Sequence, residues 1–451
     1  MFFTVPDSHS SSFLKAVSAL IALLVVALGG VTGAPAATFP DGTIPDSFSV
    51  QLKGGNTTTE NLDMIKELGV KYIRHGFPWE GIEKAPGIYD FSSSDEWVKE
   101  CEDRGLSIIG CIAFGNALYG PVAEDKGRDA YVKYAAALAE HYKGAPIIWE
   151  IWNEPNTRTF WSHLGTATDK SVKGNSEKFA DEYVALVKAV APAMHAADPN
   201  CTILGGSVSG VWTDSYAWSD WCFQKGILTS GIDGWSVHPY STKNPEDYMG
   251  AYAIIRGLMT KNGGSDSFPI INTERGYPVG KAEGFAGGDP ALSKEYQAWH
   301  CVRQYLMDLV CGIKLTSWYE WSGTEGFSLV QGNEKTPAYN AAKFMIDYLK
   351  GYHLDGRISL DSPRDFVLRF VNASGGVKLV AWTAPPAGPT PEKGSTPDKT
   401  VTHAVTIPVQ AAGPLDNFQI YGNKSAVTVA NGSITLTLTG APQYVTVAAS
   451  K

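Results

Sequence analysis

Short apolar runs alternate with longer amphipathic segments from Ser47 to Leu349, and this alternation constrains the fold more than any other feature. The apolar runs predict strands at 48–52, 72–76, 107–114, 147–153, 202–207, 234–238, 270–274 and 314–321. The amphipathic segments predict helices at 59–68, 94–104, 128–142, 176–197, 246–260, 290–309 and 338–349. Eight strands alternating with helices predict an α/β fold, a (β/α)8 TIM barrel over residues 38–352. A doubly wound open sheet is the alternative, but no Gly-x-Gly-x-x-Gly follows the first strand.

The pattern changes at about residue 353, after which strand-like runs follow one another without helices. These runs are 366–371, 377–382, 401–409, 418–421, 425–429, 433–438 and 444–447. Threonine alternates with apolar residues in 433–439, as expected of a strand with one buried face. Residues 353–451 therefore predict a small C-terminal all-β sandwich domain. The stretch 385–400 is rich in Pro, Gly, Lys and Thr, and we interpret it as a long exposed hairpin loop.

The N-terminal segment has the pattern of an export signal. Lys15 precedes the apolar run 16–28, which is followed by two glycines and then by Ala-Pro-Ala-Ala at 34–37. A short apolar core before small residues predicts a cleaved signal peptide over 1–37 and a secreted or extracytoplasmic protein. The alternative is a retained N-terminal membrane anchor, since residues 29–31 could lengthen the apolar run.

Composition and motifs exclude several classes of function. The net charge is −9, and no long basic run is present, so nucleic acid and anionic membrane surfaces are poor partners. No C-x-x-C, H-E-x-x-H or phosphate-binding loop occurs, and we expect no metal and no cofactor. The six cysteines allow two interpretations, disulfides 101–111, 201–222 and 301–311 or six free thiols in a large core. The sequence does not indicate an oligomeric state.

Two glutamates each end an apolar run at the point where the chain turns. Glu154 closes the fourth predicted strand and Glu274 the seventh. In a TIM barrel the C-terminal ends of the strands meet at one mouth, so we expect the two carboxyl groups to face each other. A facing pair of carboxyl groups is the machinery of glycoside hydrolysis, in which one donates a proton and the other attacks or activates water.

The motifs around these glutamates resemble clan A of the glycoside hydrolases. The resemblance lies in Asn153-Glu154-Pro155, Thr273-Glu274, Tyr-Ile-Arg-His-Gly-Phe-Pro-Trp at 72–79, Gly-Ile-Tyr-Asp-Phe at 87–91, His238-Pro239-Tyr240 and Trp318-Tyr319-Glu320-Trp321. Within the clan the chain is most similar to family 39, and family 5 is a near neighbour. The motifs span the whole barrel, and the C-terminal sandwich also suits family 39.

The resemblance implies roles for five residues around the reacting bond. Glu154 is expected to be the proton donor and acid/base, and Glu274 the nucleophile. Arg74 would favour the charged form of Glu274, and Tyr240 would donate its hydroxyl to the same carboxylate. Asn153 would bind the 2-hydroxyl of the sugar, a contact that strengthens in the transition state.

Further residues are expected to bind substrate or to face solvent. His238 would orient Tyr240 or the sugar. Trp318 and Trp321 are both candidates to bind the sugar, but their odd spacing on a regular strand places them on opposite faces, and we expect Trp321 to be the sugar platform. Glu320 and Glu325 are acidic residues near the mouth, and we expect both to face solvent.

These features predict a secreted retaining glycoside hydrolase that cleaves β-glycosidic bonds of a polysaccharide or oligosaccharide by double displacement. The expected separation of the two carboxyl groups is therefore about 5–5.5 Å, rather than the roughly 6.5–9.5 Å of an inverting enzyme. The alternatives are a transglycosidase with the same two carboxyl groups and a non-catalytic carbohydrate-binding relative.

Overall fold

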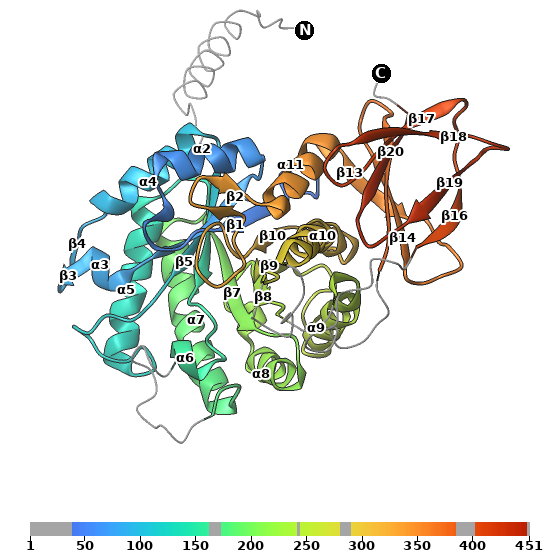
Figure 1. The fold of residues 1–451 in the computed structure, drawn as a ribbon. Helices are drawn as coiled ribbons and strands as arrows, with labels where there is room; N and C mark the ends of the chain where they lie inside the picture. The colour runs from blue at the N-terminus through green and yellow to red at the C-terminus, as the bar shows by residue number, and fades with distance from the viewer. Residues whose placement is uncertain (1–37, 162–172, 241–243, 280–289, 385–401, 449–451) are drawn as a thin grey trace, which may run out of the picture. The chain divides into compact units, whose positions relative to one another are not determined.

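Eight parallel strands close into a barrel, which confirms the predicted fold class (Figure 1). The computed structural model describes residues 38–161, 173–240, 244–279, 290–384 and 402–448. In chain order the barrel strands are β1 (Phe48–Gln51), β2 (Tyr72–Phe77), β5 (Ser107–Ile112), β6 (Ile147–Ile151), β7 (Thr202–Ser209), β8 (Gly234–His238), β9 (Ile270–Arg275) and β10 (Thr316–Trp318). The predicted segment 1–37 and the predicted hairpin loop 385–400 lie outside the described residues.

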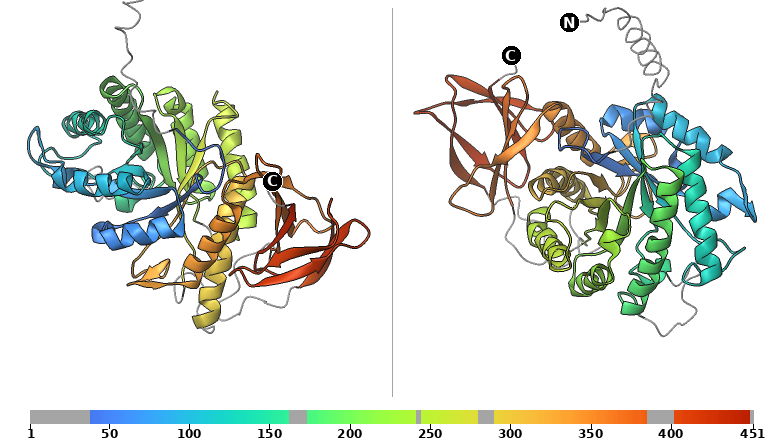
Figure 2. Two further views of the ribbon diagram at one scale, coloured as in Figure 1. Left: turned by 90° about the horizontal axis from the view of Figure 1, so that it is seen from above. Right: turned by 180° about the vertical axis from the view of Figure 1, so that it is seen from behind.

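Helices surround the barrel on its outer side (Figure 2). They are α2 (Thr59–Leu68), α4 (Ser92–Asp103), α5 (Asp125–His141), α7 (Glu177–Ala197), α8 (Thr213–Gln224), α9 (Met249–Lys261), α10 (Pro290–Val310) and α11 (Pro337–Leu349). Sequence analysis did not predict α8, because its buried face includes Ser215 and Ser219 beside Trp218 and Cys222, which dilutes the apolar period. No helix among the described residues is both long enough and apolar enough to cross a membrane.

Short elements connect these strands and helices. They are η1 (Gly54–Asn56), α3 (Trp79–Ile82), β3 (Glu83–Ala85), β4 (Ile88–Tyr89), α6 (Arg158–Trp161), η2 (Ile227–Thr229), η3 (Pro245–Tyr248), β11 (Val330–Gln331) and β12 (Glu334–Lys335). Local chemistry fixes where the helices begin and end. At α2 the Thr58 side chain accepts a hydrogen bond from the backbone N–H of Asn61, and Gly69 ends the helix with φ 94°.

The barrel interior changes from apolar to polar along the strands. An apolar layer fills its lower part and consists of Tyr72, Ile109, Ile148, Leu204, Ile271 and Leu315. Side chains that point the same way lie two positions apart on a strand, so the next layer contains Arg74, Cys111, Glu150, Thr273 and Ser317. The outward-facing residues, such as Trp149 and Ile151, pack against the helices in the main core. The polar layer lies toward the C-terminal ends of the strands, where a TIM barrel places its active site.

The C-terminal sandwich consists of two antiparallel sheets. The larger sheet has the order β13-β14-β15-β20-β17-β18, and β16 pairs with β19. The strands are β13 (His353–Arg357), β14 (Asp365–Val371), β15 (Val377–Thr383), β16 (His403–Pro408), β17 (Pro414–Phe418), β18 (Lys424–Thr428), β19 (Ser433–Leu438) and β20 (Gln443–Ala448). The core between the sheets includes Val367, Leu379, Ile407, Leu436 and Val445.

One strand of the sandwich and the state of the cysteines differ from what the sequence predicted. The strand expected at 418–421 lies earlier, as β17, because the chain turns where the N–H of Gly422 donates to the carbonyl of Gln419. The proposed disulfides are not formed. All six cysteines are described and all are free thiols, five of them buried, which agrees with the second interpretation.

Candidate active site

The end of β6 is an unusual turn that carries Glu154. Trp152 and Glu154 both have left-handed backbone conformations, with φ 69° and 47°, which non-glycine residues adopt rarely. The side chain of Asn156 holds this turn, since it donates to the Ser209 carbonyl at 3.0 Å and accepts from the Ser209 N–H at 2.9 Å. Backbone strain of this kind tends to occur at functional sites, where the surrounding structure over-determines it.

Glu154 and Glu274 meet at the barrel mouth with His238 between them. His238 Nδ1 lies 2.9 Å from Glu154 Oε1 and 3.8 Å from Glu274 Oε1. One oxygen of each carboxylate and the imidazole nitrogen all lie within 4.8 Å of one another. Ser207 Oγ is 3.1 Å from His238 Nε2, so both ring nitrogens have partners. The sequence predicted that His238 orients Tyr240 or the sugar, whereas in the structure its ring contacts the Glu154 carboxylate.

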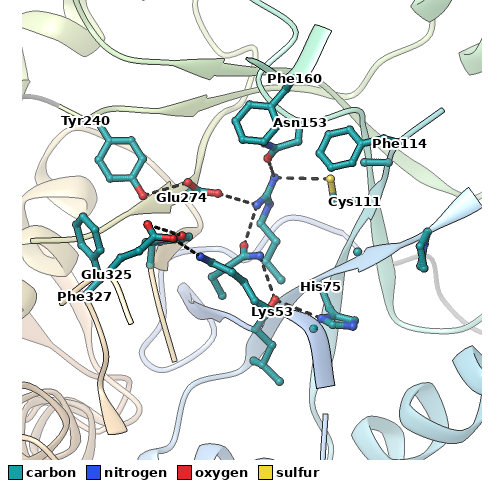
Figure 3. A pocket seen from close by; sticks show the side chains of 18 residues that line it. Lys53, His75, Cys111, Phe114, Asn153, Phe160, Tyr240, Glu274, Glu325 and Phe327 are labelled. Carbon is teal, nitrogen blue, oxygen red and sulfur yellow. Dashed lines mark hydrogen bonds and ion pairs between the residues drawn. The ribbon is translucent and has the colours of Figure 1, made fainter. Parts of the chain in front are cut away.

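Arg74 is the centre of a polar network that reaches Glu274, and Figure 3 shows Glu274 and Asn153 on the wall of the same pocket. The Arg74 guanidinium donates to Glu274 Oε2 at 3.0 Å, to Asn153 Oδ1 at 2.7 Å and to Gln51 Oε1 at 2.8 Å. The sequence analysis predicted that Arg74 lies beside Glu274, and the structure brings Arg74, Asn153 and Glu274 together as expected. Gln51 was not predicted, because an amide at the end of an apolar strand carries no specific signal.

A third carboxylate, Glu150, balances the charge of Arg74 from below. Arg74 Nε donates to Glu150 Oε2 at 2.7 Å, and the Thr273 hydroxyl donates to Glu150 Oε1 at 2.7 Å. Burial is the largest single effect on Glu150 and disfavours its charge, but the Arg74 guanidinium, His238 and the hydrogen bonds from Ser236 and Thr273 together lower the pKa of Glu150 below its usual 4.5. Burial likewise disfavours the charge on Arg74, but Glu150 and Glu274 raise its pKa, so the guanidinium stays charged.

Sequence analysis gave Glu150 no role, although one signal was present. Glu150 lies two positions after Ile148 in an otherwise apolar strand, so it shares the inward-facing side of the barrel. A charged residue at such a position requires a buried partner of opposite charge. The inward position of Arg74 on β2 could have supplied that partner by the same parity argument.

Tyr240 completes the surroundings of Glu274. Its hydroxyl donates to Glu274 Oε1 at 3.0 Å, as predicted, while Arg74 donates to the other oxygen. Burial, together with the nearby Glu274 charge, raises the pKa of Tyr240 well above 10, so the phenol remains a hydrogen-bond donor. Both oxygens of the Glu274 carboxylate are therefore held by donors from the barrel wall, which fixes the orientation of the group.

A cavity of about 820 Å³ opens beside Glu274, within the size range of ligand sites. Its wall includes Lys53, Arg74, Phe114, Asn153, Phe160, Tyr240, Glu274, Tyr319, Glu325 and Phe327 (Figure 3). The rings of Phe114 and Phe160 stack with centroids 5.6 Å apart and an interplanar angle of 9°. The wall therefore combines aromatic surface with a few polar groups, as sites for small polar ligands commonly do. Glu154, the other candidate catalytic residue, is 7% exposed to solvent.

The two tryptophans predicted to bind the sugar lie elsewhere. Trp321 is fully buried and its indole N–H donates to Asn61 of α2 at 2.9 Å, while Trp318 is fully buried and donates to the Phe327 carbonyl. The expectation for Trp321 as sugar platform is therefore wrong, because β10 ends at Trp318 and the alternation of faces does not continue past it. Tyr319 and Phe327 supply the aromatic wall of the cavity on this side.

The two further acidic residues are linked through Lys53. Glu320 is fully buried, contrary to expectation, and its Oε2 lies 3.0 Å from Lys53 Nζ. Glu325 is more exposed and lines the cavity, with its Oε1 3.1 Å from the same ammonium. Burial raises the pKa of Glu320, and Lys53 opposes this shift. The Lys53 ammonium also lies 4.4 Å from the centroid of the Tyr319 ring, so three groups hold it at the cavity wall.

The Glu154, His238 and Glu274 cluster has the donor atoms of a metal site, yet its surroundings oppose a cation. The Arg74 guanidinium donates to Glu274 at 3.0 Å, and its positive charge would repel a metal ion bound there. The residues present therefore fit a metal poorly, and the expectation of no metal remains a prediction.

Part of the chain is similar in sequence to a known family of glycoside hydrolases. Residues 40–251, which contain Glu154 but not Glu274, match the family model "Cellulase (glycosyl hydrolase family 5)". No curated protein matches the chain by sequence.

Solved structures share the fold over most of the chain. A family 39 glycoside hydrolase from Bacteroides cellulosilyticus WH2 is 21% identical with a TM-score of 0.69, covering 90% of this chain and 81% of that one. A monomeric beta-xylosidase from Caulobacter crescentus CB15 is 14% identical with a TM-score of 0.64, covering 90% and 97%. A GH30 endoxylanase from Clostridium papyrosolvens C71 is 13% identical with a TM-score of 0.63, covering 91% and 98%. The chain thus shares its fold with these glycoside hydrolases, and its residues 40–251 are similar to glycosyl hydrolase family 5.

Proposed function

We propose that this protein is a secreted retaining glycoside hydrolase that cleaves β-glycosidic bonds of a polysaccharide or oligosaccharide. The observation that carries the proposal is the meeting of Glu154 and Glu274 at the barrel mouth, with carboxylate oxygens within 4.8 Å. Retaining enzymes hold their carboxyl groups about 5–5.5 Å apart, whereas inverting enzymes leave roughly 6.5–9.5 Å for a water molecule. The short separation favours the retaining mechanism.

In the first step an oxygen of Glu274 attacks the anomeric carbon. As that bond forms, the glycosidic bond breaks and Glu154 gives its proton to the leaving oxygen. In the second step Glu154 takes a proton from water, the water oxygen attacks the same carbon, and Glu274 leaves as a carboxylate. Each step inverts the configuration at the anomeric carbon, so the product has the same anomeric configuration as the substrate.

The network around the two glutamates supports these roles. Arg74 and Tyr240 fix the Glu274 carboxylate from its two oxygens. Asn153 uses its Oδ1 to accept from Arg74, which leaves its amide N–H groups to donate to the sugar 2-hydroxyl. His238 orients Glu154 through the 2.9 Å contact of its Nδ1.

The charges of the cavity favour an uncharged sugar. Arg74 is paired with Glu150 and Glu274, and Lys53 with Glu320 and Glu325. An anionic sugar would have to compete with these carboxylates for the two cations and would face their negative charge. Structural neighbours described as a beta-xylosidase and an endoxylanase make neutral pentosides the first substrates to test.

Glu274→Ala and Glu154→Ala test the mechanism on aryl β-xylosides and β-linked polysaccharides. We expect Glu274→Ala to abolish turnover and Glu154→Ala to spare substrates with an acidic leaving group while losing natural glycosides. Azide should partly rescue Glu154→Ala and yield a β-glycosyl azide, because azide needs no general base. Glu67→Ala, which removes an exposed carboxylate of α2, is the matched control and should keep full activity.

Proton NMR of the first-formed product separates the possible outcomes. Retention of the β-anomer supports the proposal, whereas the opposite anomer, or natural-substrate activity in Glu274→Ala, would contradict it. Transfer to added sugar in place of hydrolysis would indicate a transglycosidase. Binding of oligosaccharide without turnover would indicate a carbohydrate-binding relative.

Secretion is part of the proposal and has its own test. The segment 1–37 has the pattern of a signal peptide, and we expect the mature chain to begin near Ala37 or Thr38. N-terminal sequencing of extracellular protein checks this expectation. Intact Met1 on membrane-bound protein would favour the N-terminal anchor instead.

A further inference from the structure

A buried ion pair lies where the β-sandwich contacts the barrel. Glu246 of η3 and Arg303 of α10 have side chains that are 0% and 3% exposed, with Glu246 Oε1 2.8 Å from Arg303 Nε. The indole N–H of Trp382, in β15 of the sandwich, donates to the same Oε1 at 2.7 Å. We call these three residues the Glu246 clamp. The clamp joins the sandwich, a barrel helix and the segment that follows β8.

A second contact from the sandwich reaches the neighbouring residue of η3. Arg364 Nη1 donates to Asp247 Oδ1 at 2.6 Å. The Trp382 ring stacks on Phe366 with centroids 5.1 Å apart and an interplanar angle of 8°, so the indole that reaches Glu246 has a fixed orientation. Two adjacent acidic residues of η3 are therefore held by the sandwich.

From η3 the contacts continue to the active site. The Tyr248 hydroxyl accepts a hydrogen bond from Arg275 Nε at 2.8 Å. Arg275 directly follows Glu274 in β9, and its guanidinium carbon lies 5.3 Å from the centroid of the Tyr240 ring. Tyr240 in turn donates to Glu274 at 3.0 Å. A displacement of η3 would therefore reach Tyr240 through Arg275.

Stability alone is a weak reason for such a buried ion pair. Removing two charges from water costs nearly as much as their attraction returns, so apolar residues of similar volume often stabilise a protein as well. What a buried, hydrogen-bonded pair adds is a defined geometry, because misplacement leaves a charge without its partner. At η3 that geometry determines where Tyr248 and Arg275 lie.

We propose that Glu246 and Trp382 are positioning residues of the reaction, through which the β-sandwich holds Tyr240 in place against Glu274. This inference rests on the proposed function of Glu274. It assigns the sandwich a part in catalysis rather than in sugar binding.

A double-mutant cycle tests the proposal in the full-length protein. Trp382→Phe removes the N–H donor and keeps an aromatic ring on Phe366, and we expect it to lower kcat/KM on an aryl β-glycoside by about tenfold. In a Tyr240→Phe background the same substitution should change kcat/KM by less than about twofold, because the group it positions is gone. Glu246→Gln, a second variant of nearly unchanged shape, should behave in the same way. Arg369→Gln, which breaks an exposed ion pair with Asp355 of the sandwich, should have no effect.

Two results would overturn the proposal. In the first, the separate losses of kcat/KM from Trp382→Phe and Tyr240→Phe multiply in the double variant, as expected if the Trp382 contact acts independently of Tyr240. In the second, Trp382→Phe and Glu246→Gln both fold and keep full activity. Absence of wild-type turnover would instead defeat the proposed function. The inference is then decided by fluorine NMR of 3-fluorotyrosine at position 240, whose signal should shift in Trp382→Phe and stay unchanged in Arg369→Gln.

Discussion

Glu150→Gln is the substitution that best tests the charge network below the active site. The side chain is fully buried and accepts hydrogen bonds from Arg74 and Thr273, one on each oxygen. Glutamine offers one oxygen and one NH2 group, so one of the two donors faces another donor. Breaking a buried ion pair costs about 3–5 kcal/mol. Because one acceptor and the volume remain, we expect about 2–3 kcal/mol of destabilisation at pH 7, near the value of a charge-assisted hydrogen bond.

The loss should depend on pH in a defined direction. The pKa of Glu150 is lower in the folded protein than its usual 4.5, so its ionised form stabilises the fold above that pH. This contribution disappears as the pH falls through the folded-state pKa. The stability difference between wild type and Glu150→Gln should therefore be full at pH 7 and at pH 5.5, and should shrink as the pH is lowered below 4.5.

Differential scanning calorimetry at several pH values measures this difference. At roughly 2 °C per kcal/mol for a large domain, the expected fall in Tm at pH 7 is about 4–6 °C. Glu67→Gln removes an exposed carboxylate paired with Lys335 and should change Tm by no more than about 2 °C. A Tm difference for Glu150→Gln below 1–2 °C (on the order of the surface-pair effect), or one that stays constant below pH 4.5, would refute the reasoning.

Three further predictions concern the site and the core. Tyr240→Phe should lower kcat by about tenfold to a hundredfold without a change in fold, because one donor to Glu274 is lost; steady-state kinetics and circular dichroism check this. Tyr319→Ala should raise KM for aryl glycosides several-fold, whereas Trp321→Phe should lower Tm by about 2–4 °C and leave KM unchanged, because only Tyr319 faces the cavity; kinetics and calorimetry of the two variants separate these effects. Thiol titration in denaturant without reductant should detect all six cysteines, since none is paired, and a lower count would indicate disulfides.

The barrel was predictable because its signal repeats. Each strand is a short apolar run and most helices have a clear apolar face, so α2 and β8 occur at the predicted residues. The same method missed α8, whose buried face contains small polar residues, and displaced β17, where a turn interrupts an apolar run. The period of apolar residues in a sequence reveals a helix or strand only when its buried positions are apolar and its exposed positions are polar.

Two rules made part of the site predictable. Residues at the C-terminal ends of the barrel strands lie at one mouth, and side chains two positions apart on a strand point the same way. Arg74, Asn153, Tyr240 and Glu274 come together because the C-terminal ends of parallel strands share one mouth. The prediction for Trp321 was wrong because it depended on where β10 ends, which no local pattern marks. Contacts such as Trp382 with Glu246 link residues 136 positions apart, and a single sequence carries no signal for such a pair.

Because Arg74 pairs with two carboxylates, it keeps one charged partner throughout the proposed mechanism. In the free enzyme one guanidinium faces Glu150 and Glu274. When Glu274 attacks the anomeric carbon it becomes an ester and loses its charge. Without Glu150 the buried guanidinium would then be left unpaired, a costly state in the barrel interior. With Glu150 present, Arg74 remains neutralised in the covalent intermediate, which explains why a carboxylate that cannot reach the sugar lies inside the barrel.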